Sequence, residues 1–137
     1  MTIERLNPPQ LARPSGFVHV TACRAERLVF VAGQVAYDAD GTIVGAGDFT
    51  AQTHQVMKNL RHALAAAGAT FRDVVKLTFF VKGMDEAAIR AIRTARTEYL
   101  PDDALPASTM VGVAALARPQ LLLEVEAYAV VGRNEDS

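Results

Sequence analysis

The sequence has almost no cysteine, no long apolar run and no excess of positive charge, and each absence excludes a class of protein. Cys23 is the single cysteine among 137 residues, so no disulfide can form within the chain. No stretch reaches the length of a membrane span, and the first residues lack an apolar run of signal-peptide length. A formal net charge of -1 argues against nucleic-acid binding. We therefore expect a soluble cytoplasmic protein that binds neither membrane nor nucleic acid.

Familiar catalytic and metal-binding motifs are absent as well. The sequence contains no Gly-rich phosphate loop, serine-hydrolase elbow or zinc motif. His54 and His62 are eight positions apart on a predicted helix, about two turns, which is too far to chelate one ion, and His19 is isolated. Cys23 has no histidine at a fixed spacing and is typical of a small packed residue rather than a nucleophile. We expect no metal ion and no cofactor.

Arginine is concentrated at one place in the sequence. Arg90, Arg93 and Arg96 recur every three residues, next to Glu86 and Glu98. On a helix this spacing places the three cations along one side. We interpret them as a solvated face rather than a phosphate-binding stripe.

The length and composition fit one globular domain. Hydrophobic residues make up 50% of the chain and charged residues 21%, which is ordinary for a protein with a packed core. Proline and glycine punctuate residues 1–16, which we expect to form a surface arm. Periodic sequence runs over 17–131 and predicts a single domain, and 132–137 are a polar tail.

Two helices are expected between the strands of this domain. Asp48 or Thr50 can cap the first helix, which we expect to stop at Gly68 in a left-handed conformation. Asp85 can cap the second helix, which runs to about Tyr99. Apolar and β-branched runs predict strands at 17–21, 27–32, 74–81, 109–116 and 121–131, with a short strand at 43–44.

The resulting order is β-β-(β)-α-β-α-β-β, an α+β fold with two helices packed on one face of a mixed sheet. The strands at 28–31, 74–81 and 121–131 are apolar on both faces. Because two helices cover only one face, we expect another copy of the chain to cover the other. An open dimer and a barrel-like ring would both satisfy this requirement.

Two carboxylates interrupt the apolar run from 106 to 130. Strand side chains alternate between faces, so Glu124 and Glu126 point to one face, and Leu123 and Val125 point to the other. Burying a charge is costly unless it is paired or hydrogen-bonded. The two glutamates therefore indicate either a solvated face or a functional site.

The order of several short motifs resembles the RidA/YjgF superfamily of reactive imine and enamine deaminases. The matching pieces follow the family's order over about residues 15–131, and they are VFVAGQ at 29–34, AQT at 51–53, AAGA at 66–69, DVVK at 73–76, TFFV at 78–81, PA at 106–107, VGVA at 111–114 and EVEA at 124–127. The resemblance implies the chorismate-mutase-like YjgF fold. It also implies a homotrimer with a central barrel, and three small-molecule sites in clefts between subunits.

The same resemblance assigns roles to single residues. Family deaminases hold the substrate carboxylate with an arginine two positions after a proline, and here Ser108 occupies that position after Pro106. Glu124 matches the carboxylate that orients the attacking water or shuttles a proton. An aromatic hydroxyl that helps to place this water falls at Phe17.

Further positions complete the candidate cleft. Thr109 and Met110 follow Ser108 and are candidates for substrate contact, although plain strand residues need no such role. Gly33 either lets the backbone approach the ligand or simply ends a strand. Arg118 is a candidate substitute for the missing arginine; the alternative is a surface arginine before a turn proline.

From these assignments we expect a small-molecule cleft protein that acts on or binds a reactive imine or enamine metabolite. Glu124 would orient water. We expect the standard 2-aminoacrylate deaminase activity to be absent or altered, because Ser108 replaces the arginine. A serine hydroxyl gives one neutral hydrogen bond of about 1 kcal/mol, whereas arginine makes a bidentate charged pair with a carboxylate. The alternative is a non-catalytic small-molecule-binding or chaperone-like homotrimer. Glu124 could also be a structural carboxylate, either paired with Lys76 on a neighbouring strand or facing water inside the barrel. Endoribonuclease activity, assigned to some relatives, is disfavoured because the chain lacks a basic surface and a histidine pair.

Overall fold

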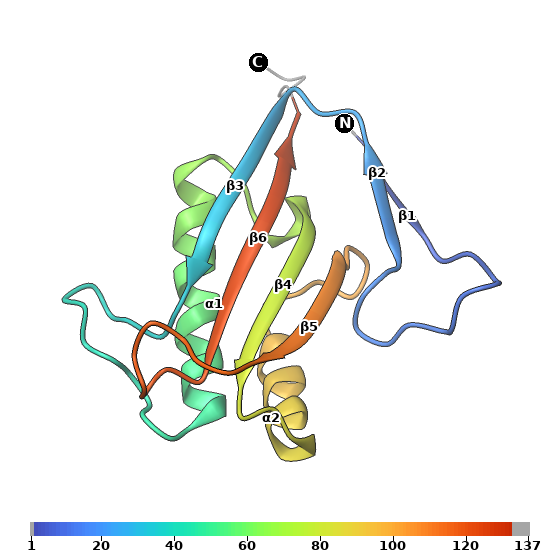
Figure 1. Cartoon of the computed structure of the whole chain (residues 1–137). Helices are drawn as coiled ribbons and strands as arrows, with labels where there is room; N and C mark the ends of the chain where they lie inside the picture. Colours follow the sequence, from blue (N-terminus) through green and yellow to red (C-terminus); the bar gives the residue numbers. More distant parts are fainter. Residues whose placement is uncertain (1, 133–137) are drawn as a thin grey trace.

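In the computed structural model, which describes residues 2–132, a four-stranded sheet carries both helices on one face (Figure 1). Its strand order is β3-β6-β4-β5; β4 and β5 are parallel, and the other neighbours are antiparallel. The α+β architecture with a mixed sheet is therefore confirmed. The elements in chain order are β1 Ile3–Leu6, β2 Val20–Cys23, β3 Arg27–Gln34, α1 Phe49–Ala66, a 3₁₀ turn Phe71–Asp73, β4 Val74–Lys82, α2 Glu86–Arg96, β5 Ala107–Val113 and β6 Leu123–Val131.

Both helices begin at the predicted aspartates. The Ala51 backbone N–H donates to the Asp48 carboxylate at 3.0 Å, and the Ala88 N–H donates to Asp85 at 2.8 Å. These caps satisfy donors that the first helical turn leaves free. Helix α1 ends where predicted, since Gly68 has a φ of 76°, a conformation that favours glycine.

The core lies between the helices and one face of the sheet. Helix α1 contributes Met57, Leu60 and Leu64, each fully buried, against Leu77 and Phe79 of the sheet. Burial of each such side chain stabilises the fold by roughly 1.5–3 kcal/mol. Strand β6 is buried at every odd position from 123 to 129, which confirms the predicted alternation.

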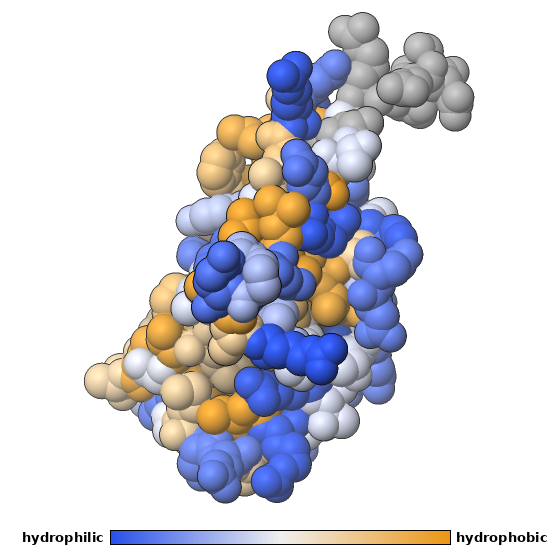
Figure 2. Space-filling view, turned by 90° about the vertical axis from the view of Figure 1, so that its right-hand side faces the viewer, coloured by the Kyte–Doolittle hydropathy of each residue, from blue (hydrophilic) through white to orange (hydrophobic). Residues whose placement is uncertain are grey.

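The opposite face of the sheet, which we call the open face, is not covered within the chain. Leu28 is 65% exposed and Phe30 is 69% exposed. Phe30 packs edge-on against Tyr128 with the ring centroids 5.3 Å apart. In the space-filling view of Figure 2 apolar residues gather on the left, where this face lies, and the helix side on the right is mostly hydrophilic.

The N-terminal arm contains a strand that the sequence analysis did not predict. Residues 3–6 form β1, which pairs antiparallel with β2 and makes a separate two-stranded sheet beside β5 (Figure 1). A hydrogen bond from the Thr21 hydroxyl to the Val75 carbonyl, 2.8 Å long, joins this small sheet to β4. Four residues are too few to show a clear alternation, and the pairing partner is distant in the sequence.

Other element boundaries also differ from those predicted. The strand expected at 17–21 is formed at 20–23, and the segment expected at 43–44 makes only an isolated bridge between Tyr37 and Ile43. Strand β5 covers 107–113 rather than 109–116, and α2 ends at 96 rather than 99. Residues 133–137 of the predicted tail lie outside the described residues. No helix between residues 2 and 132 is long and apolar enough to cross a membrane.

The prediction that all three helix arginines are solvated was wrong for Arg96. Arg90 and Arg93 are exposed, but Arg96 is only 6% exposed. Six residues on a helix with 3.6 residues per turn rotate the side chain by about 120° from its starting direction. Arg96 consequently enters the buried stripe of α2 that contains Ile92, one turn earlier.

Candidate functional site

Glu124 and Gly33, both predicted site residues, are in direct contact. Gly33 lies near the end of β3, where the pairing with β6 shifts register, and Glu124 lies on β6. A Cβ atom placed on Gly33 would be 2.7 Å from Glu124 Cδ and 2.8 Å from Cγ, closer than such atoms come in proteins. The φ of Gly33 is not positive, so the backbone itself does not demand glycine. The absence of a side chain at Gly33 leaves the space in which the Glu124 side chain lies.

Gly33 also borders a hollow of about 610 Å³ between the end of β3 and helix α1. Amide side chains of α1 fix its wall: Asn59 donates to the carbonyls of Val35 and Tyr37 at 3.0 and 2.9 Å. Gln55 donates to the Tyr37 carbonyl and to the Asn59 side chain. The segment that follows Gly33 is therefore tied to α1 by polar contacts, in addition to the packing of Ala36 in the core.

Arg118 lies next to Tyr37, one of the residues that line this hollow. Its guanidinium carbon is 5.9 Å from the centroid of the Tyr37 ring, and Tyr37 lines the hollow. This geometry is a cation–π contact at an exposed position. The structure thus brings Arg118 to the side of the sheet where Gly33 lies, although the guanidinium stacks on an aromatic ring in this arrangement.

A buried glutamine that the sequence analysis gave no role positions the loop of Arg118. Gln52 is fully buried on α1; its amide donates to the carbonyls of Gln120 and Gly45, and its oxygen accepts from the Leu122 N–H. These bonds tie the loop before β6 to the helix. The sequence feature that could have identified Gln52 is its position as a polar residue inside the apolar stripe of α1. An unpaired amide there would lower the free energy of unfolding by about 1–3 kcal/mol.

Ser108 and Glu124 lie on opposite faces of the sheet. In the parallel pairing of β4 with β5, Ser108 is opposite Leu77 and Met110 is opposite Phe79. Leu77 and Phe79 are fully buried against the helices, so Ser108 and Met110 lie on the helix face. Glu124 lies on the open face, two strands away. One protomer therefore does not bring the two candidates together.

Thr109 points to the open face and binds Lys76. The Lys76 ammonium donates to the Thr109 hydroxyl at 2.7 Å. Lys76 is not paired with Glu124, because neither ion pair found between residues 2 and 132 contains these two side chains. The structural interpretation of Glu124 as the partner of Lys76 is therefore wrong.

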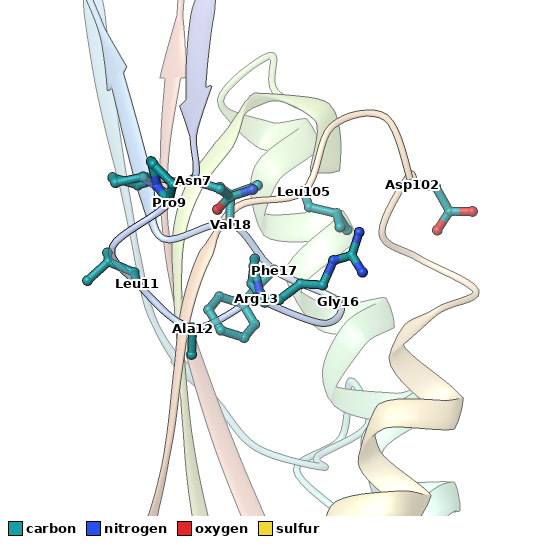
Figure 3. Close-up of a pocket in the computed structure, with 12 residues that line it drawn as sticks. Asn7, Pro9, Leu11, Ala12, Arg13, Gly16, Phe17, Val18, Asp102 and Leu105 are labelled. Atoms are coloured by element: carbon teal, nitrogen blue, oxygen red, sulfur yellow. The ribbon is translucent and has the colours of Figure 1, made fainter.

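Phe17 lies near the start of β5, away from Gly33. The neighbouring Val18 donates its N–H to the Pro106 carbonyl at 3.0 Å and bridges to Ala107. Phe17 lines a hollow of about 570 Å³ between the arm and the segment after α2, which carries Leu105 (Figure 3). Its ring packs edge-on against His19, with the centroids 5.4 Å apart.

The predicted residues thus form two groups at opposite edges of the sheet. Gly33, Glu124 and Arg118 are near the β3 edge, and Phe17 and Ser108 are near the β5 edge. Within the described part of the chain, no three His, Cys, Asp or Glu side chains are grouped in a way that could hold a metal ion. The chemistry open to this arrangement is general acid–base or water-positioning chemistry by Glu124.

Comparisons with known proteins agree with this arrangement of elements. A family model described as Endoribonuclease L-PSP matches residues 10–131. The 3-aminoacrylate deaminase RutC of Acinetobacter baylyi is 34% identical over 124 residues, which are 90% of this chain and 91% of that protein. A RutC family protein of Synechocystis sp. is 34% identical over 132 residues, covering 96% and 98% of the two chains. The crystal structure of YyfB from Yersinia pestis, a protein of unknown function in the Rid family, superposes with a TM-score of 0.89 and 39% identity, covering 96% of this chain and 100% of that chain.

Proposed function

The chain belongs to the Endoribonuclease L-PSP family, the YjgF/RidA superfamily, and on that basis we propose that it binds and hydrolyses a reactive imine or enamine metabolite. In this reaction water adds to the carbon of the C=N bond, and ammonia leaves to give the carbonyl product. Glu124 orients the water, takes its proton and returns a proton to the nitrogen. General acid–base catalysis of this kind typically contributes 10²–10⁴-fold to a rate.

The contact between Glu124 and Gly33 is the observation that carries this proposal. The Glu124 side chain lies across Gly33 on the open face, and its charge takes part in no ion pair between residues 2 and 132. A structural carboxylate would be expected to have a cationic partner, and Lys76 is engaged elsewhere. A carboxylate without a cationic partner is suited to binding water or a substrate nitrogen.

Ser108 decides which substrates are accepted. A serine in place of the carboxylate-binding arginine gives one neutral hydrogen bond, so substrates of the 2-aminoacrylate type lose their charged anchor. We infer that this activity is absent or altered, and that the preferred substrate lacks an α-carboxylate or binds it differently. The relative named 3-aminoacrylate deaminase makes 3-aminoacrylate a second compound to test.

A homotrimer would complete the site. The two groups of candidate residues lie at opposite edges of one sheet, so a cleft between protomers can combine the β3 edge of one with the β5 edge of the next. The exposed apolar residues of the open face support the same assembly, since burying them would stabilise it. Phe17 and Ser108 at the β5 edge would then face Glu124 of another protomer, and Met110 would pack against the core of its own protomer.

Ammonia release from freshly generated 2-iminopropionate, from an imine without a carboxylate and from 3-aminoacrylate tests the proposal. We expect hydrolysis of at least one compound, with a loss of about 100-fold or more in Glu124→Gln. Glu126→Gln is the matched control, because Glu126 lies two residues away on the same face and does not contact Gly33. Ser108→Arg should restore activity on 2-iminopropionate.

Two results would contradict parts of this proposal. Fast hydrolysis of 2-iminopropionate by the unaltered protein would show that the missing arginine does not limit the reaction. Binding of all three compounds without hydrolysis, unchanged in Glu124→Gln, would instead favour the non-catalytic binding protein.

A further inference from the structure

Arg96 is a buried cation without an anionic partner. It is 6% exposed, and its guanidinium makes no hydrogen bond or ion pair with another residue in the range 2–132. Its described neighbour is the Phe79 ring, whose centroid lies 5.4 Å from the guanidinium carbon. Buried arginines are rare unless they are paired, because removing the charge from water is costly.

The electrostatic surroundings of Arg96 also favour the arrival of a negative charge. Burial lowers the pKa of Arg96, and the positive charge of Arg93, one turn earlier on α2, lowers it further. Both causes indicate that the charged guanidinium is unfavourably placed in this environment. An anion next to it would offset both.

A hollow of about 120 Å³ lies beside this guanidinium. It is formed between α2, the arm and the segment that follows α2, and its polar walls include Ser15, Thr97 and Arg93. A Cβ atom on Gly16 would lie 2.9 Å from Arg96 Nη2, so the guanidinium edge points at the arm and depends on a glycine there. The hollow shares Gly16, Asp102 and Leu105 with the larger one shown in Figure 3.

We propose that this hollow binds a small carboxylate, with Arg96 as the group that holds its oxygens. Two cations, Arg93 and Arg96, and one anion, Asp102, line the hollow, which leaves one positive charge for a monoanion. Its volume equals that of about four water molecules at roughly 30 Å³ each, which suits a short-chain acid. The guanidinium fork matches a carboxylate with two parallel hydrogen bonds.

This site is separate from the contact between Glu124 and Gly33. Arg96 lies over Phe79 on the helix face of the sheet, and Glu124 lies on the open face. Carboxylate binding is measured without any hydrolysis, so this inference and the proposed function fail independently.

The test titrates the protein with sodium 2-oxobutanoate at constant ionic strength, using the thermal midpoint and the Arg Nε–Hε resonances as readouts. We expect the Arg96 resonance to shift and the midpoint to rise with ligand, since a ligand that binds only the folded state stabilises it. Arg96→Met should weaken binding tenfold or more, while Arg90→Met, an exposed arginine on the same helix, should leave it unchanged. Arg96→Lys keeps the charge but loses the two parallel hydrogen bonds of the guanidinium, so its affinity for 2-oxobutanoate should lie between those of Arg96→Met and Arg90→Met.

The stability of Arg96→Met without ligand distinguishes a binding role of Arg96 from a structural role. If Arg96 serves to bind an anion, Arg96→Met should be as stable as the unaltered protein or more so without ligand, because a buried unpaired charge is replaced by an apolar chain of similar length. A large loss of stability, or dissociation of an oligomer, would make Arg96 a structural residue and overturn the proposal. An equal midpoint rise with sodium chloride, or unchanged 2-oxobutanoate binding in Arg96→Met, would overturn it as well.

Discussion

At the scale of single residues, Gly33 controls where the Glu124 carboxylate lies. An alanine there would place a methyl group 2.8 Å from Glu124 Cγ, and the flexible glutamate would have to move away. Gly33→Ala should therefore cost little stability, at most about 1 kcal/mol, because the displaced side chain is partly exposed. It should nevertheless reduce imine hydrolysis toward the level of Glu124→Gln. Urea unfolding and the ammonia assay measure the two effects.

The control for Gly33→Ala is Gly112→Ala. A Cβ at Gly112 would lie 3.6 Å from the nearest atom, Met84 Cε, which is an ordinary contact. In the double variant with Glu124→Gln, Gly33→Ala should reduce activity no further, because both changes remove the same positioned carboxylate. An additional loss would mean that Gly33 acts on the substrate by another route.

At the scale of elements, one buried side chain fixes the loop between β5 and β6 to helix α1. Gln52→Leu would leave the Leu122 N–H and the Gln120 carbonyl without partners, at a cost of about 2–4 kcal/mol in the free energy of unfolding. Chemical denaturation measures this loss, and amide hydrogen exchange at Leu122 should accelerate. Lys58→Ala, an exposed change on the same helix, is the control. Unchanged exchange at Leu122 would mean that the loop is held by other contacts.

At the scale of the whole molecule, the open face of the sheet should form the subunit interface. We expect light scattering to give three times the monomer mass, and Phe30→Glu to give monomers. An unpaired carboxylate in a dry interface is costly, and Phe30 projects from this face with 69% of its surface exposed in the single chain. Lys58→Glu on the outer side of α1 should leave the mass unchanged. A monomeric unaltered protein would refute the trimer, and with it the cleft between subunits.

Local rules were enough to predict much of the fold. Asp48, Asp85 and Gly68 set helix boundaries through contacts with residues close in sequence, and the alternation in 123–129 depends only on strand geometry. The helix–sheet order follows from these patterns. Gly33 and Glu124 could also be predicted separately as site candidates, because each lies in a motif that resembles the family.

Contacts between distant segments were decided only by the tertiary structure. The β1–β2 pairing, the three bonds of Gln52 and the packing of Glu124 across Gly33 each join residues far apart in the sequence. The register of β5 on β4 placed Ser108 on the face opposite Glu124, and a rotation of about 120° along α2 turned Arg96 from the solvated side into the core. Hydrophobic periodicity and helix caps depend on residues that are close together in the sequence, so they can be predicted from one sequence. Which faces meet depends on register and packing, and those are determined only when the whole chain folds.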